Sequence, residues 1–176
     1  MRAIAAHGMT LEPQDASHAP AMFELLSDPA LYEYESEPPA SLEVLRSRFR
    51  RLESRRSPDG SQQWLNWVIR RDSGDVAGYV QATVHGDGRA AIAYVLGSRY
   101  WGKGMATTAV RAMMDELAAR HGATRFIAIL KAANGRSLRL LERLDFAAGN
   151  ATRECVALED DELLMVLPLT GRASSR

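Results

Sequence analysis

The middle of the chain holds three β-rich runs that are separated only by short glycine turns. They are Trp64 to Arg70, Val76 to Val84 and Arg89 to Leu96, and the connections Asp72-Ser73-Gly74 and Gly86-Asp87-Gly88 are typical of hairpins. Such short connections join antiparallel strands, because parallel neighbours need a long crossover. The sequence therefore predicts an antiparallel meander as the central feature of the fold.

A crossover follows the meander. After Gly102 the apolar residues recur at helical spacing, and Arg120, His121 and Gly122 form a C-terminal signal. Thr124 to Leu130 then reads as a buried strand, since its apolar run is nearly continuous. We expect the strand ending at Leu96 and the strand starting at Thr124 to be parallel neighbours, because a helical crossover joins them.

The remaining segments complete a mixed α/β (α+β) domain. Asp15, Ser41 and Asn134 are N-cap residues in front of three further helical patterns. Strands are expected at Met9 to Gln14 and Glu162 to Leu169, with a weak one in Ala147 to Arg153. The predicted fold is a mostly antiparallel central sheet of about six to seven strands with one parallel pair and four helices.

Length and composition limit the possible classes. With 176 residues, the chain is expected to form one domain over residues 1–170, and residues 171–176 a disordered tail. Lys and Arg balance Asp and Glu at 22 each, which argues against nonspecific nucleic-acid binding. The single cysteine, Cys155, excludes an internal disulfide and fits a reducing compartment as a small buried residue. No apolar run suggests a signal peptide or a membrane span, so we expect a cytoplasmic protein.

A glycine turn between Leu96 and Met105 is the most informative motif. The N–H groups at the start of the following helix are unpaired and lie at the positive end of its dipole, so they suit a phosphate or pyrophosphate. Glycines at 102 and 104 would let an anion approach the main chain. The alternative is a tight turn that simply needs two glycines.

Two nucleotide-binding motifs do not fit this turn. In a P-loop the residue after the lysine is a Ser or Thr that holds Mg²⁺, whereas here Gly104 follows Lys103. A dinucleotide fingerprint would need a third glycine where Thr107 stands, and it follows a strand of a parallel βαβ unit rather than a meander.

The string Arg99-x-x-Gly102-x-Gly104 resembles the acetyl-CoA pyrophosphate signature of the GCN5-related N-acetyltransferases (GNAT). The element order is similar to that of the family, and Tyr94-Val95-Leu96-Gly97 before Tyr-Trp-Gly-Lys-Gly resembles its ribosomal-protein N-terminal acetyltransferases. Asn134 to Leu144 also resembles the Asn-x-x-Ser helix start of that branch. The resemblance extends from about Met9 to Leu169.

The resemblance implies a set of cofactor-binding residues. Amides from Gly102 to Ala106 would hold the pyrophosphate, and main chain from Val95 to Gly97 would pair with the pantetheine arm in a wedge between two splayed strands. Asn134 would hydrogen-bond that arm, with a simple N-cap as its structural alternative. The cofactor-binding set is Val95, Gly97, Arg99, Gly102, Lys103, Gly104, Met105, Ala106 and Asn134.

Catalysis would rest on few groups. Main-chain N–H groups of Val95 or Leu96 would polarise the thioester carbonyl. Ser137 would protonate or hydrogen-bond the leaving thiolate, unless it is only a solvent-facing helix residue. The strand Ala90 to Tyr94 has no carboxylate, and Ala91 stands where relatives often carry a glutamate that is proposed as the general base.

Acidic residues would surround the acceptor. Five carboxylates and no basic residue lie between Asp28 and Glu43, and the same holds from Glu154 to Glu162. Both stretches could be solvated turns, but Glu33, Glu35 and Glu37 could also attract an amine. A second departure from the family is Asp145-Phe146 in place of Gly-Phe, which a left-handed Asp would tolerate.

We therefore expect an enzyme that moves acetyl from acetyl-CoA to a primary amine by direct attack. The leading hypothesis for the acceptor is a protein N-terminal α-amine. The alternative is a small-molecule amine such as an amino acid, a polyamine or an aminoglycoside. A noncatalytic acyl-CoA-binding module is the alternative from another class. No metal, nucleic acid or membrane is expected as a partner, and the protein would be a monomer or homodimer.

The failed P-loop match generates the first prediction. CoA should bind with equal affinity with or without Mg²⁺, because no Ser or Thr follows Lys103 to hold the ion. Titration calorimetry in buffer with EDTA and in buffer with excess Mg²⁺ measures this. A strict requirement for the metal would favour a nucleotide site instead.

Overall fold

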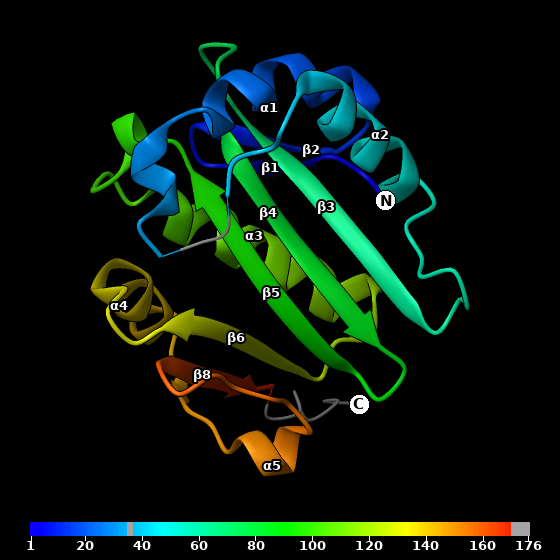
Figure 1. Ribbon diagram of the computed structural model, residues 1–176. Coiled ribbons are helices and arrows are strands. Elements are labelled where there is room, and N and C mark those ends of the chain that lie inside the picture. Colours follow the sequence, from blue (N-terminus) through cyan, green and yellow to red (C-terminus); the bar gives the residue numbers. More distant parts are fainter. Residues whose placement is uncertain (35–36, 170–176) are drawn as a thin grey trace.

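The computed structural model describes residues 1–34 and 37–169, and the described residues form one eight-stranded sheet with helices on both faces (Figure 1). The strand order is β1-β2-β3-β4-β5-β6-β8-β7, and the only parallel pair among these strands is β5 with β6. The strands are β1 (Ile4–Ala6), β2 (Met9–Pro13), β3 (Gln62–Arg71), β4 (Val76–His85), β5 (Arg89–Leu96), β6 (Arg125–Lys131), β7 (Ala147–Ala148) and β8 (Glu162–Pro168).

The predicted meander is confirmed as β3, β4 and β5, and the parallel pair as β5 and β6. The sheet has one strand more than the upper expected number because β1 forms a hairpin with β2 through the turn at His7 and Gly8. The weak strand is confirmed as β7, which pairs with β8. The expectation for residues 171–176 lies outside the described residues.

Four main helices cover the sheet: α1 (Ala19–Leu26), α2 (Leu42–Leu52), α3 (Met105–Arg120) and α4 (Gly135–Arg143). Neighbouring residues of β3 show why both faces are covered. Trp67 belongs to the core cluster beneath α3 and α4, whereas Val68 belongs to the cluster beneath α1 and α2. Side chains alternate along a strand, so β3 buries apolar residues on both faces of the sheet.

Local signals set the helix ends as expected. The Ser41 side chain accepts a hydrogen bond from the N–H of Val44, and Gly122 beyond the end of α3 has a φ of +72°. Asp145 after α4 has a φ of +66°, so the departure from Gly-Phe is a left-handed aspartate. Cys155 follows the short helix α5 (Ala151–Glu154) and is exposed, so its expected burial was wrong.

The parallel strands pair along only part of their length. Pairing runs from Arg89 with Arg125 to Ala91 with Ile127, although β5 continues to Leu96 and β6 to Lys131. The two strands therefore separate toward their C-terminal ends, as the family resemblance implies. The outer half of β5 has β4 on one side and an opening on the other.

Gly78 of β4 keeps this end of β5 in place. It lies opposite Leu96 in the antiparallel register. A Cβ on Gly78 would lie 2.0 Å from the Val95 carbonyl oxygen and 2.9 Å from the Leu96 Cα. The close approach of β4 to β5 therefore requires glycine here.

We predict that Gly78→Ala lowers the free energy of unfolding by about 1–3 kcal/mol, because the added methyl group must displace main chain rather than a flexible side chain. Urea denaturation monitored by tryptophan fluorescence measures the change. Gly86→Ala is the matched control, since a Cβ there meets nothing within 4 Å. Equal stability of the two variants would contradict the close-approach argument.

Candidate active site

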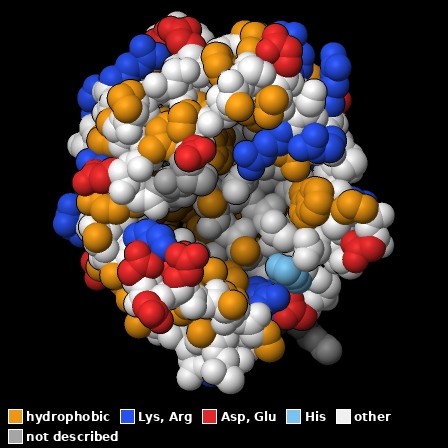
Figure 2. All heavy atoms as spheres, viewed as in Figure 1, with side chains coloured by type: hydrophobic (Ala, Val, Ile, Leu, Met, Phe, Trp, Pro, Cys, Tyr) orange, Lys and Arg blue, Asp and Glu red, His pale blue; other side chains and the backbone are white. Residues whose placement is uncertain are grey.

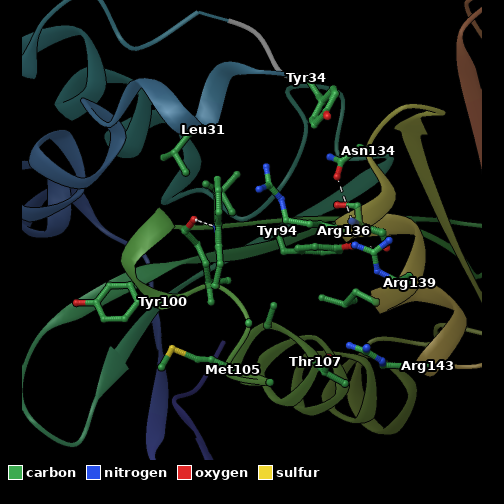
Figure 3. A pocket seen from close by; sticks show the side chains of 18 of the residues that line it. Leu31, Tyr34, Tyr94, Tyr100, Met105, Thr107, Asn134, Arg136, Arg139 and Arg143 are labelled. Carbon is green, nitrogen blue, oxygen red and sulfur yellow. Dashed lines mark hydrogen bonds between the residues drawn. The ribbon is translucent and has the colours of Figure 1, made fainter.

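A cavity of about 400 Å³ lies where β5 and β6 separate (Figure 3). It receives side chains from the end of β5, the glycine turn, the first turn of α3, one face of α4 and the segment after α1. The lining residues are Ala30, Leu31, Tyr34, Tyr94, Val95, Leu96, Tyr100, Trp101, Gly102, Gly104, Met105, Ala106, Thr107, Asn134, Arg136, Ser137, Arg139, Leu140 and Arg143.

The glycine turn exposes main-chain donors to the cavity. Gly102 and Gly104 both have a φ of +73°, and a Cβ at either position would meet nothing within 4 Å. The N–H groups of residues 102 to 104 donate to no other described residue. The first N–H groups of α3 have no partner within the helix. These groups together form an open cradle for an anion at the positive end of α3.

The end of β5 presents main chain to the opening. The Gly97 N–H donates to the Ala77 carbonyl at 3.0 Å, and the Gly97 carbonyl accepts from the Tyr100 N–H at 2.9 Å. Main-chain groups alternate in direction along a strand, so Val95 faces β4 as Gly97 does, and Leu96 faces the opening. The Leu96 carbonyl accepts a hydrogen bond from the Trp101 indole N–H at 2.8 Å. The main-chain N–H of Leu96 therefore remains as a donor directed into the opening.

The start of α4 supplies two polar side chains. The Asn134 side-chain oxygen accepts from the Ser137 N–H at 3.1 Å, so Asn134 is the N-cap of α4. Its NH₂ group and the Ser137 hydroxyl have no hydrogen-bond partner among the described residues. Both residues line the cavity and keep a polar group available to a ligand.

Three of the expected cofactor-binding residues do not line the cavity: Gly97, Arg99 and Lys103. The Arg99 guanidinium lies over the Tyr100 ring, 4.8 Å from its centroid. The Lys103 ammonium donates to the Arg99 carbonyl at 2.9 Å. These two cations pack along the outside of the glycine turn.

Three arginines of α4 were missed as site residues. Arg136, Arg139 and Arg143 line the cavity from α4. Their spacing of three and four residues places them on one face of the helix, and this spacing could have identified them from sequence. The Arg136 guanidinium lies over the Trp101 ring at 3.8 Å and donates to the Glu33 carboxylate at 3.2 Å.

Glu33 and Glu37, the two described members of the expected acidic set, do not line the cavity. Glu33 pairs with Arg136 instead, and its hydrogen bond with the Tyr34 hydroxyl raises the pKa of Tyr34. Glu37 is exposed outside the cavity, and Glu35 lies outside the described residues. In the second acidic stretch, Glu159 and Asp161 pair with Lys131.

Asp28 connects the segment after α1 to the end of β5. Its carboxylate accepts from the N–H and the hydroxyl of Ser98, and from the Ala30 N–H at 3.0 Å. The hydrogen bond from Ser98 is the main reason that the pKa of Asp28 lies below its usual value. This link holds Ala30 and Leu31 at the cavity wall.

The titratable groups among the described lining residues are arginines and tyrosines. No Asp, Glu or His occurs among the described residues that line it. Within the described ranges, no cluster of three or more His, Cys, Asp or Glu side chains could hold a metal ion. None of the described helices is both long and apolar enough to cross a membrane.

Comparison with known proteins identifies the class. Residues 9–147 match the family described as "Acetyltransferase (GNAT) domain". The chain therefore belongs to the GNAT acetyltransferase family, and it is an acetyl-CoA-dependent acyltransferase. Among curated proteins, none matches the chain.

Several solved structures share the fold over nearly the whole chain. A ribosomal L7/L12 α-N-protein acetyltransferase, RimL, in complex with coenzyme A has a TM-score of 0.78 at 19% identity, covering 95% of this chain and 98% of that chain. A ribosomal-protein-S5-alanine acetyltransferase from Vibrio fischeri has a TM-score of 0.78 at 18% identity, covering 96% and 97%. The aminoglycoside acetyltransferase AAC(6')-Ib in complex with coenzyme A has a TM-score of 0.73 at 20% identity, covering 91% and 94%.

The anion cradle generates a prediction for Gly104. We expect Gly104→Val to abolish CoA binding, because its side chain would fill the approach to the N–H groups at the start of α3. Gly8→Val is the matched control, since Gly8 has the same φ of +73° and equally open space but lies in the β1–β2 turn. Both variants carry the same backbone strain. Calorimetry should show loss of CoA binding for Gly104→Val alone; retained affinity would contradict the cradle.

Proposed function

We propose that this enzyme acetylates an α-amino group, with a protein N-terminus as the leading acceptor. One observation carries the proposal: the described lining of the cavity offers no carboxylate or imidazole that could deprotonate the acceptor. An amine must be neutral to attack. The acceptor that tolerates the missing base best is the one that is already partly neutral at physiological pH.

Free energies of deprotonation separate the two common amines. An α-amino group has a pKa near 7.7–8.0 and a lysine side chain one near 10.4. At pH 7 the neutral form costs about 1–1.4 kcal/mol for the α-amine and about 4.6 kcal/mol for lysine. A positioned base contributes about 10²–10⁴-fold. Its absence therefore matters less for an α-amine.

Acetyl-CoA supplies the thioester that the amine attacks directly, and CoA leaves as the thiolate. The N–H groups of residues 102 to 106 hold the pyrophosphate, and the Asn134 NH₂ group hydrogen-bonds the pantetheine arm. The Leu96 N–H, which faces the opening, stabilises the negative charge that develops on the carbonyl oxygen. Orientation of the two reactants supplies most of the rate enhancement.

Proton transfers complete the reaction. The Ser137 hydroxyl, which has no partner among the described residues, hydrogen-bonds the leaving thiolate, and any proton that it gives up is replaced from water. The proton that the attacking amine releases passes to water in the cavity. No covalent intermediate on the enzyme is required, since the single cysteine, Cys155, lies at the end of α5, outside the cavity.

The similarity to ribosomal-protein acetyltransferases supports a protein N-terminus, and the similarity to AAC(6')-Ib supports a small-molecule amine as the second candidate. A panel that includes peptides, amino acids, polyamines and aminoglycosides distinguishes them by release of free CoA. Release with no member of the panel would favour a binding module.

We predict a characteristic pH dependence for two peptides, one with a free α-amine and no lysine, the other N-terminally blocked with one lysine. The ratio of their initial rates should be large at pH 7 and should fall about tenfold at pH 9, because the α-amine is then almost fully neutral while lysine still gains free base. Titration of the enzyme cancels in this ratio.

A lysine peptide that turns over faster at pH 7 would contradict the proposal and indicate a hidden base. Glu33→Gln, Glu35→Gln and Glu37→Gln would then be the first variants to measure. The base would be the glutamate whose replacement restores the expected pH dependence of the ratio.

A further inference from the structure

Two cations in the cavity have no partner among the described residues. Arg139 and Arg143 line it and form no ion pair with any described residue, whereas Arg136 is held by Glu33 and Trp101. No carboxylate among the described residues lines the cavity to offset their charge. A concave site with unpaired guanidinium groups favours a ligand with a negative charge at that place.

The two arginines occupy the same face of α4. Four residues of a helix span about 6 Å, so both guanidinium groups can reach one anionic group. A Cβ on Gly135 would lie 3.2 Å from Arg139 Nη1, which shows that Arg139 extends back along the helix. Arg143 lies beside Thr107 of the first turn of α3 (Figure 3). Arg143 therefore borders the cradle at the start of α3, and Arg139 extends from the same helix face toward the start of α4 (Figure 3).

CoA carries more negative charge than the pyrophosphate that the cradle would bind. The N–H groups of the glycine turn and of α3 match a pyrophosphate. CoA carries a further phosphate monoester on its ribose, with about −1.5 to −2 charge at pH 7. Guanidinium groups bind such a phosphate through paired, charge-assisted hydrogen bonds. We propose that Arg139 and Arg143 bind the ribose 3′-phosphate and make the enzyme select CoA over dephospho-CoA.

The position along α4 separates this role from acceptor binding. Asn134, Arg136 and Ser137 lie at the start of the helix, where the thioester is proposed to react. Arg143 lies at the other end, about 10 Å further along the axis. An anionic group of the acceptor would meet Arg136 first, and the nucleotide end of CoA would meet Arg143 first, with the Arg139 guanidinium between the two.

The experiment compares Kd values for CoA and for 3′-dephospho-CoA by calorimetry, in the absence of any amine. Wild type should bind dephospho-CoA at least about tenfold more weakly than CoA. A tenfold change in Kd corresponds to the lower end of what hydrogen bonds to charged groups contribute. The double variant Arg139→Gln/Arg143→Gln should bind both ligands alike, with the affinity that wild type has for dephospho-CoA. Arg111→Gln, exposed on α3 outside the cavity, is the control for loss of an arginine elsewhere on the surface and should keep the wild-type ratio.

Three results would overturn the proposal. Wild type could bind both ligands equally, or the double variant could retain the discrimination. The double variant could also weaken both ligands by the same factor, which would assign the arginines to the pyrophosphate. Thermal unfolding without ligand verifies that the variants fold, because Arg143 also lies in the last turn of α4, where a cation stabilises the helix. No amine is present, so the outcome is independent of the proposed acceptor.

Discussion

The site depends on one interruption of hydrogen bonding, the early end of pairing between β5 and β6. A continuous parallel pair would satisfy the main chain of both strands and leave no space between them. Here pairing stops at Ala91 and Ile127, while both strands continue. The crossover helix α3 starts beyond the open end of β5, so the same interruption brings an unpaired strand edge and a helix N-terminus to one cavity. Close contact at Gly78 and the link from Asp28 to Ser98 hold that end of β5 from either side.

Acidic and basic side chains are interspersed over the face of the molecule that Figure 2 shows. Carboxylates near the entrance pair with cations, as Glu33 does with Arg136, and the exposed pair contributes about 0–1 kcal/mol. The lining itself carries only positive formal charge among the described residues. A polyanionic co-substrate is therefore attracted, while a protonated amine is disfavoured next to unneutralised arginines. Binding of CoA first would reduce this repulsion toward the acceptor.

Periodicity and turn residues were enough to predict most of the fold, because β3, β4, β5 and the main helices are long and carry clear signals. β1 was missed since three residues show no period, and its pairing depends on the neighbouring strand. The sequence predicted that β5 and β6 are parallel neighbours, but not where their pairing ends, because no single residue marks that point. The separation of the two strands was expected only from the family resemblance. The two family motifs predicted the glycine turn before α3 and the polar residues Asn134 and Ser137 at the start of α4. They did not single out Arg139 and Arg143, which lie within the matched segment Asn134 to Leu144 but are not part of the Asn-x-x-Ser pattern, and they could not show that Glu33 pairs with a residue 103 positions away.

An unpaired strand edge is also a hazard, because it can pair with a strand of another molecule and start aggregation. The Trp101 indole N–H donates a hydrogen bond to the Leu96 carbonyl at 2.8 Å. The edge of β5 therefore lacks one acceptor that a strand of another molecule would need. The edge borders a cavity that α4 and the glycine turn also line. The hydrogen bond from Trp101 therefore makes the open edge of β5 a poorer partner for a strand of another molecule.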